Sequence, residues 1–180
     1  MTTPGGSMAN MYAMQLARHK AAPETKTGGN GAVKGGKTLV ALTSDEAHYS
    51  YQKASNLLGL GTDNLVKVKC DSTGAMDLQA LDEALTALHA RGDALPFFVG
   101  ATAGTTVLGA FDPFDAIAEV CAKHGVWLHV DGAWGGAALF SGTHRHLLQG
   151  ANKVGPWVVG PLVRWFVGSL VRWFVGSLAH

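Results

Sequence analysis

Short apolar runs alternate along this chain with longer stretches of helical periodicity. The apolar runs cover residues 38–42, 65–69, 96–100 and 126–130, and the helical stretches cover residues 5–20, 46–58, 76–90 and 113–124. Strands that alternate with helices of this length form parallel sheets, because a parallel connection needs a crossover of a dozen or more residues. The pattern predicts an α/β domain with a mainly parallel sheet and flanking helices.

The apolar run at residues 126–130 delivers one acid, Asp131, to its carboxyl end. Ligands of open parallel sheets bind outside the carboxyl ends of the strands. Asp131 is therefore a candidate for ligand chemistry, and a capping Asp at a strand-to-loop turn is the alternative. The small residues that follow leave room for a flat ligand to come close; they are Gly132, Ala133, Gly135 and Gly136.

Two further segments place polar groups where the predicted helices begin. A glycine-rich turn at residues 4–10 opens the first helix, with Ser7 or Asn10 as its cap. Free N–H groups and the positive end of the helix dipole make such a turn an anion cradle, although an ordinary capped helix fits equally well. Asp45 or Ser44 can cap the next helix, which puts His48 in its first turn. There the imidazole can stack on a ring, act as acid or base, or cap the helix.

The predicted strand at residues 96–100 runs into a loop of small residues and hydroxyls. Thr105 and Thr106 in this loop either bind a polar ligand atom or satisfy the loop's own backbone. Asp112 is expected to cap the following helix, with Pro113 at its first position and Gly125 ending it. One edge of a parallel sheet can bring these loops together. An anion-binding turn, a histidine ring that can stack and an acid together suit a flat, phosphorylated, heteroaromatic ligand.

Composition narrows the class of protein. A net charge of +1 gives no reason to expect a nucleic-acid partner. Cys70 and Cys121 lack metal-site spacing and are expected to be reduced thiols, and residues 1–10 lack the features of a signal peptide. We therefore expect a cytoplasmic protein without a bound metal.

Residues 31–38 match the G-x-x-x-x-G-K-[ST] pattern of phosphate-binding loops. Such a loop needs a strand before it and a helix after it. Here a polar loop precedes the pattern and a predicted strand at residues 38–42 follows it. The sequence context argues against a nucleotide-binding enzyme, which stays as the less favoured alternative.

Four motifs in order resemble a known family, and the resemblance covers roughly residues 4–152. They are residues 4–14 (Pro-Gly-Gly-Ser-Met-Ala-Asn-Met-Tyr-Ala-Met), 43–50 (Thr-Ser-Asp-Glu-Ala-His-Tyr-Ser), 101–113 (Ala-Thr-Ala-Gly-Thr-Thr-Val-Leu-Gly-Ala-Phe-Asp-Pro) and 129–136 (His-Val-Asp-Gly-Ala-Trp-Gly-Gly). Together they resemble the group II pyridoxal-phosphate-dependent amino-acid decarboxylases, the glutamate and cysteine-sulfinate decarboxylase family.

The resemblance implies a fold, a reaction and partners. The fold is part of the large domain of the type I pyridoxal-phosphate (aspartate aminotransferase-like) fold. The reaction is decarboxylation of an acidic amino acid (glutamate, aspartate or cysteine sulfinate), with pyridoxal 5'-phosphate as cofactor. The full-length relative is expected to be a homodimer, without a nucleic-acid or membrane partner.

The resemblance also implies roles for individual residues. Ser7, with the amides of Met8 and Ala9, would hold the cofactor phosphate at the helix N-terminus. His48 would stack on the pyridine ring, and Asp131 would pair with the ring nitrogen, which makes these two the catalytic residues. The carboxylate has a chemical purpose, because a protonated ring accepts the electrons left when carbon dioxide departs.

Two more positions carry over from the family. Ala133 would lie against the ring, and Thr105 would support the polar edge of the cofactor. Gly132 departs from the pattern, because the family usually has alanine there, and we expect this change to loosen the turn without removing function.

Larger departures concern the lysine that holds the cofactor as a Schiff base. The family carries it in an Asn-Pro-His-Lys motif, and this sequence contains no such motif; Lys153 follows Asn152, but too early and in another context. The family's N-terminal segment and C-terminal small domain are also absent. We expect residues 1–152 to be a partial cofactor-binding domain and the chain to be inactive or very weak. The alternative is a non-catalytic cofactor-binding or interfering subunit fragment.

Residues 153–180 form an apolar segment with an internal duplication. The eight residues 162–169 (Leu-Val-Arg-Trp-Phe-Val-Gly-Ser) recur identically at 170–177. We interpret this segment as an aberrant tail of a truncated gene. A membrane-lying segment is the alternative, and two prolines (Pro156 and Pro161) and two arginines (Arg164 and Arg172) argue against it.

Overall fold

The computed structural model describes residues 3–153 and 158–159 of the chain. Its helices are α1 (Gly6–Ala21), α2 (Thr25–Gly28), α3 (Ser50–Leu57), α4 (Leu78–Arg91) and α5 (Phe114–His124). Its strands are β1 (Thr38–Ser44), β2 (Leu65–Val68), β3 (Ala94–Thr102), β4 (Trp127–Gly132) and β5 (Val158–Val159). Short 3₁₀ helices occur at η1 (Asn30–Ala32), η2 (Lys34–Gly36), η3 (Thr62–Asn64), η4 (Gly135–Phe140), η5 (Arg145–Leu148) and η6 (Ala151–Lys153).

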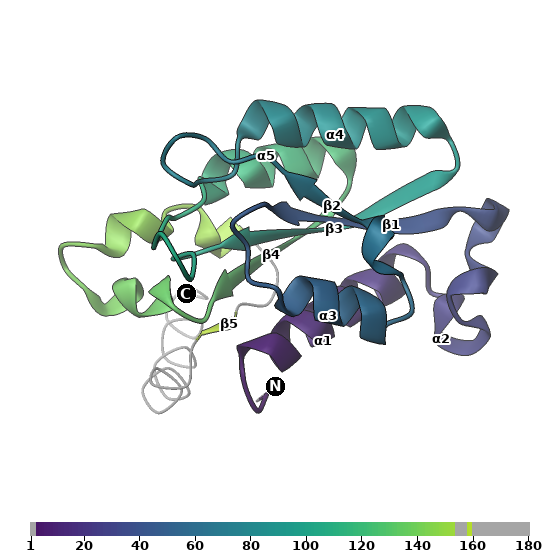
Figure 1. Cartoon of the computed structure of the whole chain (residues 1–180), viewed down its shortest axis with the longest axis horizontal. Coiled ribbons are helices and arrows are strands. Elements are labelled where there is room, and N and C mark those ends of the chain that lie inside the picture. Colours follow the sequence, from purple (N-terminus) through teal and green to yellow (C-terminus); the bar gives the residue numbers. More distant parts are fainter. Residues whose placement is uncertain (1–2, 154–157, 160–180) are drawn as a thin grey trace, which may run out of the picture.

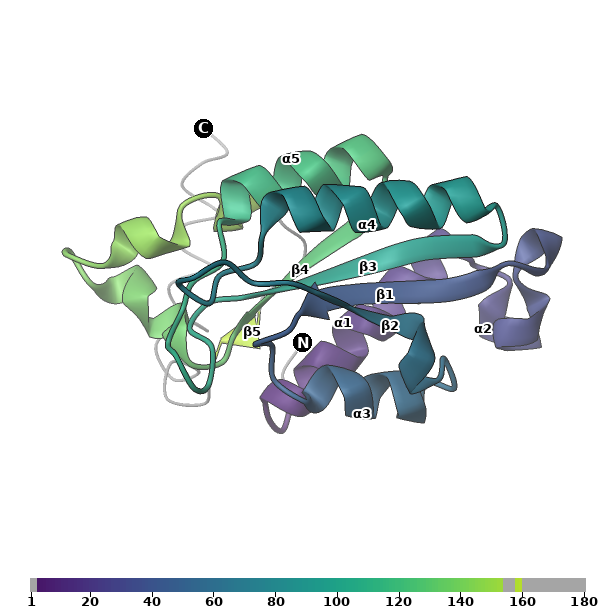
Figure 2. The ribbon, with the colours of Figure 1, turned by 45° about the horizontal axis from the view of Figure 1, so that its top comes forward.

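The described strands form one sheet in the order β2-β1-β3-β4-β5, and every neighbouring pair is parallel. Helices α1 and α3 cover one face and α4 and α5 cover the other (Figures 1 and 2). The predicted α/β class is confirmed, and each of the four predicted strands is present. Parallel pairing places the carboxyl ends of β1, β3 and β4 at one edge of the sheet, which is the edge where ligands bind in such folds.

Two apolar clusters, one on each face, hold the layers together. On one side, Leu81, Leu85 and Leu88 of α4 project onto the sheet at helical spacing and are buried. On the other side, Met14 of α1 and Tyr51 of α3 pack over β1 and β3. Burying a leucine side chain contributes roughly 2 kcal/mol, so these helices are held mainly by their apolar faces.

The prediction for the start of the second long helix is wrong. We expected a helix from residue 46, capped by Asp45 or Ser44, but β1 continues to Ser44 and α3 begins only at Ser50. The Asp45 N–H donates to the Val68 carbonyl at 2.9 Å, which prolongs the pairing of β1 with β2. Because the backbone is still committed to the sheet there, helical hydrogen bonding starts later. His48 consequently precedes α3 and does not lie in its first turn.

The predicted role of Asp112 is also wrong. Helix α5 begins at Phe114, with Pro113 and not Asp112 at the N-cap. The buried Asp112 carboxylate instead accepts hydrogen bonds from the backbone N–H groups of Met76 and Thr102, both at 2.7 Å. It therefore fastens the end of β3 to the segment before α4. Gly125 ends α5 in the left-handed conformation, as predicted.

Asp112 gives the stability of the chain a specific pH dependence. Burial raises its pKa from 3.8 to about 6. Because the folded-state pKa lies above the unfolded one, this group destabilises the fold above pH 6. That cost is relieved as the pH falls toward 4, by roughly 3 kcal/mol for a shift of this size.

We therefore expect the stability difference between wild type and Asp112→Ala to grow as the pH falls from 7 to 4. Urea unfolding of both proteins across this range measures it. The comparison cancels the titration of carboxylates that do not interact with Asp112; Asp71 is the carboxylate whose charge acts on it. A difference that stays constant or shrinks toward pH 4 would contradict the assignment.

The remaining sequence predictions concern the glycine-rich loop, the cysteines and the membrane alternative. The segment at residues 31–36 forms 3₁₀ turns and passes directly into β1, so the strand-loop-helix order of a nucleotide-binding loop is absent there. Cys70 and Cys121 are free thiols, as predicted. Within the described part of the chain, no helix has the length and apolar character needed to span a membrane.

The predicted apolar tail at residues 153–180 lies outside the described residues, except for Lys153 and β5. Strand β5 pairs in parallel with Asp131 and Gly132 at the end of β4. The duplicated segment at residues 162–177 is not described. The domain boundary at residue 152 stays a prediction.

Candidate functional site

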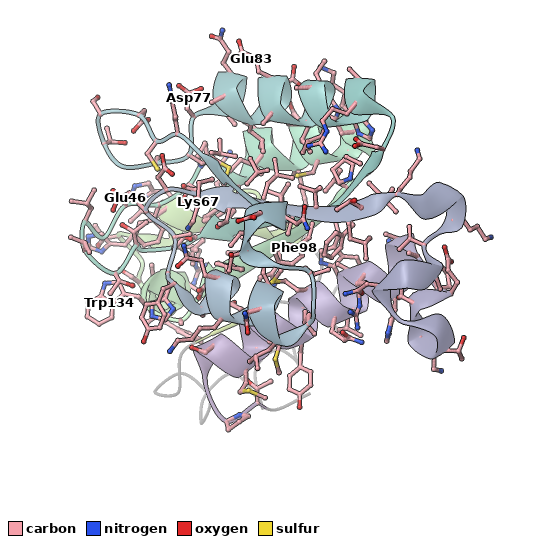
Figure 3. The ribbon with its side chains drawn as sticks, turned by 45° about the vertical axis from the view of Figure 1, so that its right-hand side comes forward. Glu46, Lys67, Asp77, Glu83, Phe98 and Trp134 are labelled. Atoms are coloured by element: carbon pink, nitrogen blue, oxygen red, sulfur yellow. The ribbon has the colours of Figure 1, made fainter. Side chains whose placement is uncertain are left out.

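A cavity of about 280 Å³ opens at the carboxyl edge of the sheet. Its walls are Gly6, Ser7, His48, Thr102, Gly104, Thr106, Asp131, Ala133 and Trp134. Five of the residues predicted from the sequence thus meet around one space: Ser7, His48, Thr106, Asp131 and Ala133. Figure 3 shows Trp134 at the periphery of the molecule and Phe98 in its interior. The indole of Trp134 is 75% exposed, so this wall faces outward.

Asp131 is the buried acid of the cavity, with 6% of its surface exposed. It lies opposite Thr102 in the register of β3 and β4. Its Oδ1 accepts from the backbone N–H of Ala133 at 3.0 Å, and its Oδ2 accepts from Nδ2 of Asn10 at 2.7 Å. Oδ1 therefore makes the turn-capping contact expected of a structural Asp. Oδ2 is instead held by the Asn10 side chain of α1.

His48 reaches the cavity from the turn before α3. Its Nδ1 accepts a hydrogen bond from the Ser50 backbone N–H at 3.2 Å, so the proton of the neutral ring resides on Nε2. The Tyr49 ring lies beside it, with 4.2 Å between ring centroids. His48 thus presents a ring of defined tautomer to the cavity, where it can stack on a flat ligand.

The N-terminus of α1 supplies the positive side of the cavity. The first helical hydrogen bond runs from Ala9 N–H to the Gly5 carbonyl at 3.1 Å, so the N–H groups of Gly6, Ser7 and Met8 lack acceptors within the helix. Neither Ser7 nor Asn10 caps the helix; the N-cap is Gly5. These free donors can bind an anion. The Ala9 amide is already bonded, and its part in anion binding stays a prediction.

Close packing brings this helix end to the loop after β4. A Cβ atom added at Gly6 would lie 3.1 Å from the Cβ of Ala133, which is tighter than an ordinary contact. Glycine at this position therefore allows the N–H groups of α1 and the Asp131 loop to share one cavity.

Thr105 is placed differently from the other predicted residues. It is fully buried, and its Oγ1 accepts from the Ala110 N–H at 3.1 Å, within its own loop. It does not line the cavity, although its neighbours Thr102 and Thr106 do. The geometry favours the alternative that Thr105 satisfies the loop backbone, and its part in ligand binding remains a prediction.

Sequence reasoning missed Thr102 as a site residue. Thr102 is 4% exposed, and among the described residues its Oγ1 has no hydrogen-bond partner. A buried hydroxyl without a partner in a cavity wall is suited to a ligand's polar atom. A signal was present in the sequence, because Thr102 closely follows the apolar run at residues 96–100, whose carboxyl end lies at the same edge as Asp131.

Lysine does not contribute to the cavity. All nine lysines of the sequence belong to the described part of the chain, and none of them is among the lining residues. Lys153, the one closest in sequence to the expected motif, forms an ion pair with Asp115 at 2.8 Å.

These features define the ligand chemistry that the cavity suits. Free N–H groups and a helix dipole favour an anion such as a phosphate. An imidazole ring and small residues favour a flat ring, and the doubly hydrogen-bonded carboxylate favours a protonated nitrogen on that ring.

Residues 1–161 match the family model described as the pyridoxal-dependent decarboxylase conserved domain. Human cysteine sulfinic acid decarboxylase is 52% identical over 150 residues, which are 83% of this chain and 30% of that protein. An acidic amino acid decarboxylase of Bos taurus is 50% identical over 150 residues, 83% of this chain and 28% of that protein. The chain thus spans about 30% of the length of these curated relatives.

Solved structures agree with this similarity. The crystal structure of mouse CSAD in its apo form matches with a TM-score of 0.86 and 48% identity, covering 89% of this chain and 33% of that one. The structure of Oryza sativa TDC with PLP matches with a TM-score of 0.72 and 31% identity, covering 84% of this chain and 32% of that one. The fold that carries the cavity is therefore shared with these solved structures.

Proposed function

Because the chain belongs to the pyridoxal-dependent decarboxylase family, we propose that it forms part of the cofactor domain of an acidic amino-acid decarboxylase. Its substrates are expected among cysteine sulfinate, aspartate and glutamate, as the names of its relatives suggest. The observation that carries the proposal is the Asp131 carboxylate, held by Ala133 and Asn10 in the wall of a cavity whose other side is a helix N-terminus. The proposed cellular location is the cytoplasm, which the two free thiols support.

The residues around the cavity fit pyridoxal 5'-phosphate. Ser7 and the unbonded N–H groups at the start of α1 match its phosphate, His48 matches its ring, and Asp131 matches its ring nitrogen. The Thr102 hydroxyl, buried without a partner among the described residues, supplies one more polar contact. When bound, the cofactor supplies an electron sink for the electron pair that departing carbon dioxide leaves behind.

The chain's own part in the reaction is to keep that ring nitrogen protonated. The Asp131 carboxylate would accept the N–H of the ring and, at 6% exposure, would do so with little competition from water. His48, with Nδ1 held by the Ser50 amide, keeps its ring in one orientation beside the cavity. Ala133 leaves space because its side chain ends at a methyl group.

We further propose that this chain alone is catalytically inactive. Covalent attachment of the cofactor in this family needs a lysine amine at the cavity. The absence of any lysine among the lining residues supports the proposal, and so does the commitment of Lys153 to Asp115.

The test is to titrate the purified chain with pyridoxal phosphate, reduce the mixture with borohydride and locate any pyridoxyl-lysine by mass spectrometry. We expect saturable binding without a single modified lysine, and no carbon dioxide release from cysteine sulfinate, aspartate or glutamate. The urea-denatured chain controls for random labelling of exposed lysines. One specific adduct together with carbon dioxide release would overturn the inactivity, and failure to bind would overturn the cofactor site.

A second candidate function is that of a cofactor-binding or interfering fragment that joins an intact subunit. Three large apolar side chains near the cavity favour it, because they are exposed: Val107 at 82%, Leu108 at 58% and Trp134 at 75%. Val107 and Leu108 directly follow the cavity residue Thr106, and Trp134 is part of the cavity wall. Exposed apolar groups beside a ligand cavity suit a surface that another chain covers. We propose a homodimer for the full-length enzyme on the same ground.

Co-expression of the tagged chain with an intact subunit tests this second function. We expect co-purification and reduced decarboxylase activity, and both effects should weaken in a Val107→Ser, Leu108→Ser double variant. Absence of co-purification with a folded chain would remove the candidate.

A further inference from the structure

Asn10 is a buried amide in the second turn of α1 that sequence reasoning treated only as a cap. It is 1% exposed and makes three side-chain hydrogen bonds to other elements. Its Nδ2 donates to Oδ2 of Asp131 at 2.7 Å and to Oγ of Ser50 at 2.9 Å. Its Oδ1 lies 3.0 Å from Nε2 of His129. A single side chain therefore connects α1 with α3 and β4.

The chemistry of its partners determines the orientation of this amide. An ionised carboxylate offers only acceptors, so the NH₂ group of Asn10 must face Asp131. The amide oxygen then faces His129, and Nε2 of that ring must carry a proton. The result is a directed series in which His129 donates to Asn10 and Asn10 donates to Asp131.

The strand geometry places this series on one face of the sheet. His129 and Asp131 are two residues apart on β4, so their side chains project from the same face. That face is covered by α1, which delivers Asn10 between them. His129 is fully buried, and its ring also packs against Phe98, with 5.8 Å between centroids. Packing thus fixes the His129 ring, and the Nε2–H of that ring orients the Asn10 amide.

These contacts restrict how Asp131 can face a ligand. Ala133 N–H occupies one position on Oδ1 and Asn10 occupies one position on Oδ2. Each carboxylate oxygen keeps a second lone pair, and rotation about the Cβ–Cγ bond would break both hydrogen bonds. The Ala133 contact alone would let Oδ2 swing, because a single hydrogen bond leaves a carboxylate free to pivot.

From this geometry we propose that Asn10 is the positioning residue of Asp131. Its amide holds Oδ2 so that the carboxylate meets a protonated ring nitrogen in one orientation, and His129 fixes the amide. The inference rests on the proposed function, since it assumes that the ligand is pyridoxal phosphate. It goes beyond that function by assigning a role to a residue that does not line the cavity.

The test compares two ligands that differ at one ring atom. Pyridoxal 5'-phosphate has the ring nitrogen, whereas its 1-deaza analogue has a carbon there and cannot donate to Asp131. Equilibrium binding of both to the folded chain gives a preference ratio that reports on this contact alone. We expect Asn10→Ala to lower that ratio about tenfold, with the affinity for the deaza analogue unchanged.

Three further variants make the result specific. Asn10→Asp has nearly the same volume but no permanent donor, so it should lower the ratio even if Asn10→Ala folds poorly. Ser50→Ala removes the other acceptor of the same amide and should leave the ratio unchanged. In an Asp131→Ala background, Asn10→Ala should have no further effect on the ratio.

The experiment distinguishes failure of the proposed Asp131 contact from failure of the proposed role of Asn10. If the wild-type chain binds both ligands equally, the proposed contact of Asp131 is wrong and the inference falls with it. If the wild-type chain prefers pyridoxal phosphate and Asn10→Ala keeps that preference, only the role of Asn10 is overturned. Equal loss of affinity for both ligands, or a loss that persists without Asp131, would likewise reduce Asn10 to a structural residue.

Discussion

Asp131→Ala is expected to lower the affinity of the chain for pyridoxal 5'-phosphate by roughly 100-fold. The physical reason is the loss of a charge-assisted hydrogen bond in a site with little water, where removing one partner of a buried charged pair costs about 2–5 kcal/mol. Asp131 is 6% exposed, so solvent cannot replace the missing carboxylate. The variant also leaves the Asn10 and Ala133 donors without their acceptor.

Fluorescence titration of the purified variant measures this loss. Asp82→Ala is a matched control, because it removes the same charge from a half-exposed site on α4 where Asp82 pairs with Lys123. Asp131→Asn keeps the side-chain volume but places an NH₂ donor either against the cavity or against one of the donors that Asp131 accepts from. This variant should therefore also bind pyridoxal phosphate weakly. Affinity within threefold of wild type for Asp131→Ala would contradict the assignment of this residue.

Gly100→Ala is expected to destabilise the fold by about 2–3 kcal/mol. Gly100 is buried within β3, and an added Cβ would lie 2.7 and 2.8 Å from two ring carbons of Tyr51 and 2.9 Å from its hydroxyl oxygen. Tyr51 is fully buried on α3, so its ring cannot turn outward. The methyl group would therefore force α3 away from the sheet and disturb the turn that carries His48.

Chemical unfolding of the Gly100→Ala variant measures the cost. Gly31→Ala is the control, because an added Cβ there meets no heavy atom within 4 Å, and its effect should stay within about 0.5 kcal/mol. A Gly100→Ala, Tyr51→Leu double variant should lose less stability than the sum of the two single changes, because the shorter side chain relieves the contact. Strict additivity would show that the two residues do not collide.

The sequence allowed the fold class and much of the site to be predicted, and the reason lies in periodicity. Apolar runs that alternate with helical patterns specify parallel pairing, and parallel pairing places strand ends at one edge. Asp131 was identified as a site residue in this way, and the same reasoning extends to Thr102. The resemblance to a family then supplied roles for Ser7, His48 and Ala133, which the structure brings to one cavity.

The errors concern residues whose partners are distant in the sequence. Asp112 and Asp45 each stand where a helix cap is favoured, and local propensity alone predicts that role. The Asp112 carboxylate bonds to Met76, 36 positions away, and the Asp45 amide bonds to Val68. Tertiary hydrogen bonds of this kind override local preference, because a buried donor or acceptor without a partner costs more than a cap contributes.

By itself, the sequence determined the alternation of strands and helices, the placement of Asp131 at a strand end and the family to which the chain belongs. Only the tertiary structure decided that Asn10 would hold Asp131 and that Asp112 would bond to the Met76 amide. Those outcomes depend on which segments the fold packs against one another. A local sequence pattern carries no information on such contacts, since they join residues as far apart as Asn10 and Asp131, 121 positions along the chain.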